Sequence, residues 1–227
     1  MENFLKKLDE QVADSWAQVS QGAFWKHVLA HGFDHEFYVM LMTQVYHYTR
    51  HNAQNQALAA VNVMSDRVNL LRFCLHHAFE EAGHDAMVLN DLKAVGVAPE
   101  TVMASAPLPE TEAFIAYLYR VASTKDATAR LGYSYWAENC YGYIKDILDA
   151  MRRDLNIGDR QMTFFVAHAE IDTEHFEEVK DVVQQFCREP KMQEETLNVL
   201  RTTLHLQGEM LEGVYRVYTS QRQLVAV

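Results

Sequence analysis

Two short segments of the chain place two histidines and one carboxylate at steps of four and three residues. The first segment, LHHAFEEAGHDAM at 75–87, carries His77, Glu81 and His84. The second, VAHAEIDTEHFEEV at 166–179, repeats the steps with a different carboxylate, and its three residues are His168, Asp172 and His175. On an α-helix such steps return to nearly the same face, so each triplet is expected to project together.

The joint pattern favours a metal site over accidental spacing. A single helical histidine is more often a surface or core residue than a ligand, but carboxylate-x2-His occurs twice here. Between the two copies lies Glu138, in the aromatic-rich segment YSYWAENCYGYIKD. A carboxylate buried there is costly unless it is paired or bound to a cation. Two carboxylate-x2-His helices with a Glu from another helix are how helical bundles hold two metal ions.

The types of the candidate ligands limit which metal ion the site would bind. Imidazole and carboxylate together suit iron, manganese or zinc better than calcium or magnesium. None of the cysteines falls at a ligand step in these segments, which makes zinc less favoured. Iron and manganese are not separated by ligand type.

Almost every segment that could position these residues has the apolar periodicity of a helix. The chain has 227 residues, of which 49% are hydrophobic, so it can bury a sizeable core. No window shows sustained alternation with β-branched enrichment, so no sheet is expected. The expected fold is all-α, a single domain at 1–227 with seven to eight helices. The expected helices cover about 2–20, 23–30, 35–63, 66–95, 110–122, 125–155, 159–187 and 193–220, with Ser65 and Asp66 as a helix start and Gly96 as a helix end.

Charge and cysteine content restrict the partners. The net charge of −11 argues against nucleic acid or an anionic membrane as a partner. The three cysteines form no CxxC pair, which favours a reducing cytoplasm over a disulfide framework. The first residues lack the apolar region of a signal peptide, and no apolar run reaches membrane-spanning length. The expectation is a cytoplasmic protein that acts on a small molecule.

These residues resemble a known family, the haem-oxygenase-like di-metal oxidases and oxygenases, which are related to thiaminase II and pyrroloquinoline quinone synthase. The family's His-x3-Asp-x2-His element matches His168, Asp172 and His175, and its central Glu matches Glu138. A Glu-x2-His pair from one of its branches matches the 81–84 segment. A ferritin-like site fits less well, because the helix before Asp66 has no carboxylate after Glu36.

The resemblance implies a haem-oxygenase-like fold over essentially the whole chain. It also implies O2-dependent oxidation as the function. Two Fe(II) ions would activate O2 as co-substrate, with Glu81 and Glu138 as catalytic ligands. It implies Glu81, His84 and His168 on one iron, and Glu138, Asp172 and His175 on the other. The substrate would be a fatty acid, an amino acid or an amine, which undergoes oxidative C–C cleavage or N-oxidation. Dimers are common in the family, so a homodimer is compatible with the resemblance.

Several alternatives stay open at this point. His77 or Glu80 could replace Glu81 as a ligand. A thiaminase-like hydrolase would use Cys140 as nucleophile, with Glu209 or Glu212 on the last helix. On a continuous helix, however, Cys140 should face away from Glu138, because two residues turn about 200°. A cofactor-free oxidase like pyrroloquinoline quinone synthase would need a more basic site. The last alternative is a non-catalytic helical metal-binding protein.

Overall fold

The structure, a computed structural model, describes residues 2–225. The side chains of residue 2, of residues 169–173 and of residue 225 lie outside the described part. Helices are the regular elements throughout these residues, and no strand occurs among them, as the periodicity predicted. Within the same residues, no helix combines the length and the apolarity that a membrane crossing requires.

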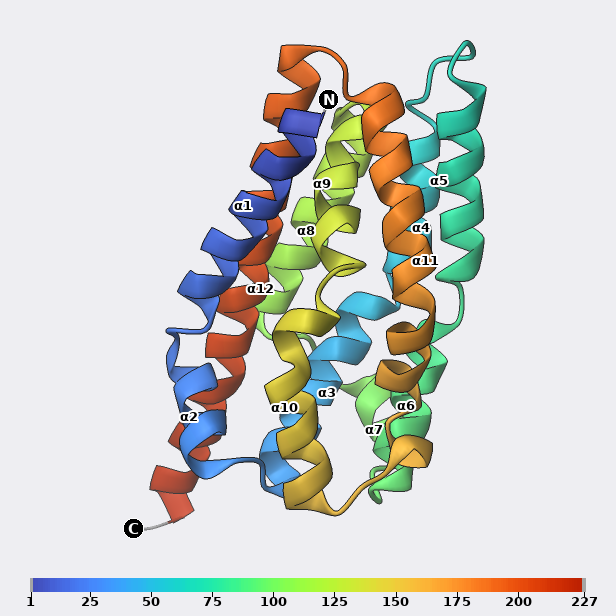
Figure 1. Cartoon of the computed structure of the whole chain (residues 1–227). Helices are drawn as coiled ribbons and strands as arrows, with labels where there is room; N and C mark the ends of the chain where they lie inside the picture. The colour runs from blue at the N-terminus through green and yellow to red at the C-terminus, as the bar shows by residue number, and fades with distance from the viewer. Residues whose placement is uncertain (1, 226–227) are drawn as a thin grey trace.

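Figure 1 shows an elongated bundle whose helices run along one common direction. The helices are labelled along the chain, and their bounds are α1 Glu2–Val19, α2 Ala23–His31, α3 His35–Thr49, α4 Asn52–Ala60, α5 Val68–Glu80, α6 His84–Ala94, α7 Pro99–Ala104, α8 Pro109–Thr124, α9 Ala127–Ala137, α10 Tyr141–Leu155, the short 3-10 helix η1 Asp159–Gln161, α11 Thr163–Phe186 and α12 Pro190–Val225.

Local sequence signals set many of the helix ends. Asp34 caps α3 by accepting a hydrogen bond from the Phe37 amide at 2.9 Å, and Asp126 caps α9 in the same way. Three of the prolines open α7, α8 and α12, where the missing amide hydrogen costs nothing. Gly96, expected to end a helix, has a φ of +90° just after α6.

Three of the expected helices are each divided in two, and α7 forms at 99–104, where no helix was expected. The expected helix at 35–63 divides into α3 and α4, the one at 66–95 into α5 and α6, and the one at 125–155 into α9 and α10. The helix start expected at Ser65 and Asp66 is wrong, because α5 begins at Val68 and its N-cap residue is Arg67. Apolar periodicity continues across each break, so it does not reveal the break.

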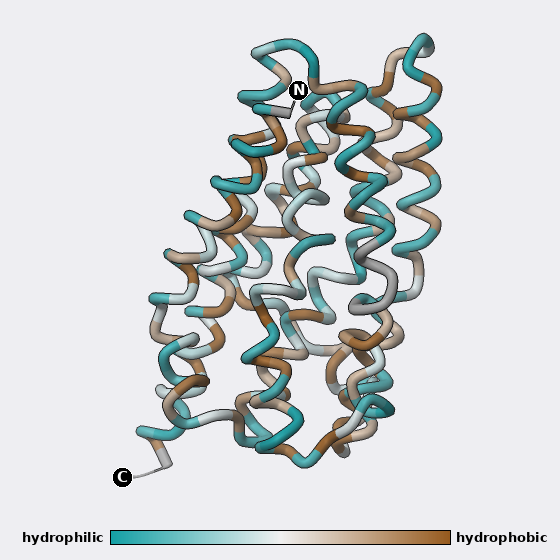
Figure 2. The backbone as a smooth tube through the Cα atoms, in the orientation of Figure 1, coloured by the Kyte–Doolittle hydropathy of each residue, from teal (hydrophilic) through white to brown (hydrophobic). Residues whose placement is uncertain are grey.

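α12 is the longest helix and packs against α9, α1, α8 and α3. Figure 2 shows that hydrophobic residues recur on one side of most helices. Their side chains form one continuous core, which contains all three tryptophans. Gly132 of α9 permits the closest approach to α12, because an added Cβ would lie 2.1 Å from the Thr196 carbonyl oxygen.

Candidate metal centre

Two of the three helix breaks carry the carboxylates singled out in the sequence. α5 ends at Glu80, Glu81 is its C-cap residue, and α6 begins at His84. Gly83 completes the turn with a φ of +100°, a conformation that glycine adopts without strain. Glu138 is likewise the C-cap residue of α9, three residues before α10 begins. Both carboxylates therefore leave the backbone where a helix ends, inside the bundle.

α11 contributes a histidine from each of two positions seven residues apart, His168 and His175. Seven residues make about two helical turns, so both rings leave the same side of α11, roughly 10 Å apart along its axis. Asp172, the third residue of this predicted triplet, has its side chain outside the described part of the chain. Its predicted role as a ligand stays a prediction.

The first cluster consists of Glu81, His84 and His168. One potential ligand atom from each of the three lies within 4.8 Å of the others. His84 Nδ1 is 3.5 Å from Glu81 Oε2, and the rings of His84 and His168 have centroids 4.6 Å apart. These are the three residues that the family resemblance assigned to one iron.

The second cluster consists of His77, Glu138 and His175, whose ligand atoms also lie within 4.8 Å of one another. His77 Nε2 is 3.0 Å from Glu138 Oε1, and His175 Nδ1 is 3.5 Å from Glu138 Oε2. Glu138 and His175 were expected together, whereas His77 was considered only as a substitute for Glu81. The structure brings His77 to the other cluster, because α5 ends before Glu81 and the triplet does not lie on one helix.

The two clusters adjoin each other. His77 Nε2 is 3.9 Å from Glu81 Oε1, so the same imidazole approaches a carboxylate of each cluster. Glu80, another alternative ligand, has Oε1 3.4 Å from His175 Nε2, with its side chain 28% exposed. It lies at the rim of the second cluster, while Glu81 is at the first.

Electrostatics indicate that both carboxylates are ionised. Burial opposes the charge on Glu138, but hydrogen bonds with His175 and His77 outweigh it and lower the pKa of Glu138 to about 2. The Glu81 carboxylate is buried too, yet its hydrogen bond with His84 leaves its pKa below the ordinary value. The hydrogen bond with Glu138 raises the pKa of His175 to about 9.

The buried charges are balanced by histidines. Among the described residues, the ion-pair contacts of Glu81 and Glu138 all go to imidazoles, and none goes to Lys or Arg. Buried carboxylates whose ion-pair contacts are all imidazoles are stable only if protons on those imidazoles or bound metal cations supply the positive charge. The donor set therefore fits two divalent cations that accept imidazole and carboxylate ligands.

Neighbouring groups orient the donors. His168 Nδ1 is 2.5 Å from the Phe164 carbonyl oxygen. A hydrogen on Nδ1 leaves Nε2 with its lone pair toward the cluster, the tautomer that a metal ligand needs. Asn52 donates to Glu81 Oε2 at 3.2 Å, and Tyr133 donates to the Asn52 carbonyl oxygen. His77 Nδ1 is buried and has no hydrogen-bond partner among the described residues.

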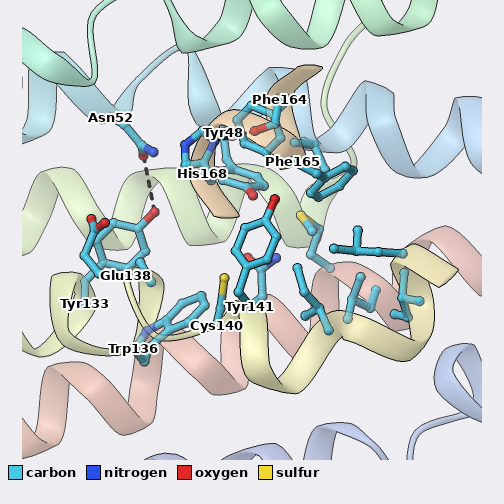
Figure 3. Close-up of a pocket in the computed structure, with 18 of the residues that line it drawn as sticks. Tyr48, Asn52, Tyr133, Trp136, Glu138, Cys140, Tyr141, Phe164, Phe165 and His168 are labelled. Carbon is cyan, nitrogen blue, oxygen red and sulfur yellow. Dashed lines mark hydrogen bonds between the residues drawn. The ribbon is translucent and has the colours of Figure 1, made fainter. Parts of the chain in front are cut away.

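A cavity of about 140 Å³ opens beside the two clusters. Glu81, Glu138, His77 and His168 are among its lining residues, and most of the remaining wall is aromatic or aliphatic. Figure 3 shows Glu138, Tyr133 and Asn52 on one side, Tyr48, His168 and Tyr141 in the middle, and unlabelled aliphatic side chains beyond Tyr141. The cavity gives a small molecule access to the metal-binding groups.

Arg130, which also lines the cavity, was missed in the sequence. It is 3% exposed, and its Nε and Nη1 donate to Asn55 Oδ1 and Ser134 Oγ, both uncharged. Arg130 lies eight residues before Glu138, about two helical turns along α9, and no local pattern singled it out. Arg50, another arginine in the chain, is exposed and does not line this cavity.

Cys140 is placed differently from the expectation. It lines the same cavity as Glu138, because α9 and α10 are separate helices and the 200° argument does not apply across their break. Glu209 and Glu212, the partners considered for it, line another cavity between α1 and α12. Tyr135, three residues before Glu138, donates a hydrogen bond to Asp9 at 2.7 Å, away from the clusters.

Comparison with known proteins identifies the family and the fold of this chain. The model of the iron-containing redox enzyme family matches residues 39–208. A crystal structure from Shewanella denitrificans OS217, described as a domain of unknown function with a heme oxygenase-like fold, is 40% identical. Its TM-score is 0.93, and the match covers 96% of this chain and 94% of that one.

More distant structures share the fold alone. A TenA homolog from Pseudomonas syringae pv. tomato is 13% identical with a TM-score of 0.79, covering 94% of this chain and 93% of that one. A CADD-like protein of unknown function from Nostoc punctiforme is 15% identical with a TM-score of 0.75, covering 95% and 98%. No curated protein matches the chain. The family match spans both clusters and most of the residues that line the cavity, and this protein therefore belongs to the iron-containing redox enzymes, with an all-α haem-oxygenase-like fold.

Proposed function

We propose that the protein is a non-haem di-iron oxidoreductase that uses O2 to oxidise a small organic substrate. The observation that carries this proposal is the pair of adjoining clusters, each with one carboxylate and two imidazoles in ligand reach of one another. The description of the family as iron-containing redox enzymes favours iron over manganese. Ferrous ions, when bound, supply the reduction of O2 that the side chains alone cannot perform.

The chain's own residues have separate tasks in this proposal. Glu81, His84 and His168 hold one iron, and His77, Glu138 and His175 hold the other. The two carboxylates neutralise half of the charge of two ferrous ions. His168 stays oriented by Phe164, and Asn52 fixes the Glu81 carboxylate. The apolar wall of the cavity excludes water from the reacting atoms.

The test is metal loading followed by O2. Metal-free protein is loaded with Fe(II) under anaerobic conditions, bound iron is counted, and O2 is added in a stopped-flow spectrometer. We expect two irons per chain and a transient absorbance. His168→Ala should bind less iron and lose the transient, whereas His205→Ala, exposed on α12, should behave as wild type. Iron binding without any reaction with O2 would instead indicate a non-catalytic metal-binding protein.

A second candidate function is thiaminase-like hydrolysis with Cys140 as nucleophile. It is favoured by the position of Cys140 on the cavity wall and by the fold of the TenA homologues. It is disfavoured because the two acidic residues expected to assist lie at another cavity. Hydrolysis that survives complete removal of metal and is lost in Cys140→Ala would establish this function instead.

A further inference from the structure

A row of tyrosine and tryptophan rings leads from the metal centre toward the surface of the bundle. Tyr133 of α9 contacts Trp136 with ring centroids 5.5 Å apart, and Trp136 contacts Trp16 of α1 at 6.3 Å. Trp16 stacks on Tyr143 of α10 at 5.5 Å, with an interplanar angle of 6°. We call these four rings, in the order Tyr133, Trp136, Trp16 and Tyr143, the aromatic path.

The inner end of the aromatic path is connected to the first cluster by hydrogen bonds. The Tyr133 hydroxyl donates to Asn52 Oδ1 at 3.4 Å, a bond that Figure 3 shows. Asn52 Nδ2 in turn donates to Glu81 Oε2 at 3.2 Å. Trp136 is held in place by its own bond, since its Nε1 donates to Thr203 Oγ1 at 2.8 Å. The inner rings therefore have a fixed position relative to a metal-binding carboxylate.

The outer end of the aromatic path reaches water. Tyr143 is only half-buried, whereas Tyr133, Trp136 and Trp16 are each 5% exposed. Burial and, after it, the nearby Asp9 carboxylate raise the pKa of Tyr143. A negative charge beside a ring lowers the cost of removing an electron from that ring. Asp9 itself is exposed, so the carboxylate or water can receive the phenolic proton of Tyr143.

These four rings can carry an electron vacancy, which is the loss of one electron from a ring. Electron tunnelling falls off exponentially with distance, so steps between rings in contact are much faster than one step across the whole path. Tryptophan can lose an electron and keep its N–H proton, whereas tyrosine must release its phenolic proton. At Tyr133 that proton faces an amide oxygen, which is a poor base. A vacancy therefore moves outward and stops at Tyr143, where the proton can leave.

A second ring contact of Tyr133 offers no such route. Phe114 lies 5.9 Å from Tyr133, between centroids, and 5.6 Å from Tyr48. Phenylalanine is far harder to oxidise than tyrosine or tryptophan, so a vacancy does not pass through it.

We propose that the aromatic path supplies electrons to the metal centre when O2 reacts and no substrate is bound. This inference rests on the proposed function, because the path serves the same centre. Reduction of O2 to two water molecules takes four electrons and four protons. Two ferrous ions give two electrons and become ferric, and the other two pass one at a time along the path.

The balance is completed outside the protein. A one-electron reductant in solution, ascorbate in the test below, fills each vacancy at Tyr143, so every ring returns to its starting state. The four protons come from water. When substrate is bound, the substrate supplies the two electrons instead. The path thus protects the residues around the clusters from oxidation by O2 that reacts unproductively.

The first experiment needs neither iron nor O2. Azide radicals made by pulse radiolysis remove an electron preferentially from tryptophan in the metal-free protein. The tryptophan radical should then decay in a first-order phase while a tyrosyl radical grows at the same rate, each followed by its own absorbance. Trp16→Phe should lose this transfer phase. The fold should tolerate the change, because Trp16 Nε1 is buried without a hydrogen-bond partner among the described residues.

A second variant tests the outer end, and two others are matched controls. Tyr143→Phe should also lose the transfer phase. Trp25 is as buried as Trp16 and contacts it at 5.9 Å, but it stands beside the path. Tyr215 is half-buried like Tyr143, and its ring contacts His27. Trp25→Phe and Tyr215→Phe should therefore keep the rate of the transfer phase.

The second experiment uses iron-loaded protein, with repeated additions of O2 in the presence of ascorbate and without substrate. Mass spectrometry measures the oxygen atoms added to Cys140, Met151 and Met210, which line the cavity and are readily oxidised. Wild type and Trp25→Phe should stay intact, whereas Trp16→Phe should accumulate oxidised residues. Without ascorbate, rapid freezing and electron paramagnetic resonance should detect a tyrosyl radical in wild type.

Two results would overturn the proposal: a transfer phase that is absent from wild type or unchanged in Trp16→Phe, or equal oxidation of the cavity in wild type and Trp16→Phe. Both differ from failure of the di-iron proposal. If iron does not bind or does not react with O2, the path has no electron acceptor and the inference fails with the function. If iron and O2 react while Trp16→Phe changes nothing, the function holds and the path alone is excluded.

Discussion

His77 approaches both clusters, with Nε2 3.0 Å from Glu138 Oε1 and 3.9 Å from Glu81 Oε1. Its substitution should therefore weaken metal binding, although the family resemblance placed His77 on neither iron. We expect His77→Ala to weaken binding of the second iron by at least about tenfold, since even groups behind the ligands contribute that much.

The neighbouring histidine provides the control for this prediction. His76 lies on the same helix with its side chain 62% exposed, and it contacts Glu80. His76→Ala should bind iron as wild type does, measured by anaerobic titration of Fe(II) against a chelator. Equal iron affinity in His77→Ala and His76→Ala would exclude His77 as a ligand.

The pair formed by Glu138 and His175 makes the stability of the metal-free protein depend on pH. The pKa of Glu138 falls from 4.5 to about 2 on folding, so its contribution is complete above pH 4.5 and is lost as pH falls toward 2. The pKa of His175 rises from 6.5 to about 9, so its contribution is complete below pH 6.5 and is lost as pH rises toward 9. The ion pair between Glu138 and His175 therefore stabilises the folded protein most between about pH 4.5 and pH 6.5.

Urea unfolding with a chelator present measures this contribution. Between pH 6 and pH 9 the wild-type free energy of unfolding should fall by on the order of 1–3 kcal/mol more than that of His175→Gln. Other histidines also titrate in this range, so the difference between the two proteins isolates the pair. Parallel pH curves for wild type and His175→Gln would contradict the assignment.

At the scale of elements, α11 is anchored by a carboxylate from another helix. Asp91 of α6 is fully buried and accepts hydrogen bonds from the Thr163 amide, the Thr163 hydroxyl and the Phe164 amide, at 2.8, 2.7 and 3.0 Å. It satisfies amides at the first turn of α11, as an N-cap residue would. The helix that carries His168 and His175 therefore begins at a fixed point.

Asp91→Ala leaves these buried donors without a partner. We expect it to lower the free energy of unfolding by about 2–3 kcal/mol and to weaken iron binding, because both α11 histidines lose their support. Asp91→Asn, which keeps one acceptor oxygen, should lose less. Asn90→Ala, at the exposed neighbouring position, should change neither property. Thermal unfolding and iron titration of the three variants check this order.

The helix breaks show how far sequence reasoning extends. Residue types and spacing singled out Glu81, His84, Glu138, His168 and His175 as candidate ligands, and the family resemblance divided them into the two groups that the structure shows. They did not predict that Glu81 and Glu138 follow helix ends, because apolar periodicity measures which face is buried and not whether the backbone hydrogen bonds continue. His77 was misplaced for this reason, and Cys140 was oriented wrongly.

At the scale of the whole molecule, the close approach of α9 to α12 depends on Gly132. A Cβ there would lie 2.1 Å from the Thr196 carbonyl oxygen and 2.8 Å from the Leu200 amide nitrogen, both backbone atoms. Gly132→Ala must separate the two helices, with an expected loss of about 1–3 kcal/mol in the free energy of unfolding.

Gly142 of α10 is the matched control, since its added Cβ would meet nothing within 4 Å. Gly142→Ala should be neutral or stabilising by up to about 1 kcal/mol, because alanine favours the helix. Chemical denaturation of both variants gives the comparison. Equal stability of the two would mean that α9 and α12 shift apart without cost.

The all-α architecture was predictable because helical periodicity runs through almost the whole chain. The arrangement of the helices was not derivable from that pattern and came from the family resemblance, which the match over residues 39–208 confirms. Contacts such as Arg130 with Asn55 join residues far apart in sequence, and no local pattern predicts them.

A single helix, α11, contributes an imidazole to each cluster, His168 to the first and His175 to the second. Any rotation or shift of α11 about its anchor at Asp91 therefore moves both rings together. A first metal ion that orders α11 reduces the entropy lost by the second, which makes loading cooperative. The protein should pass between empty and doubly loaded forms, with few molecules that hold one metal ion.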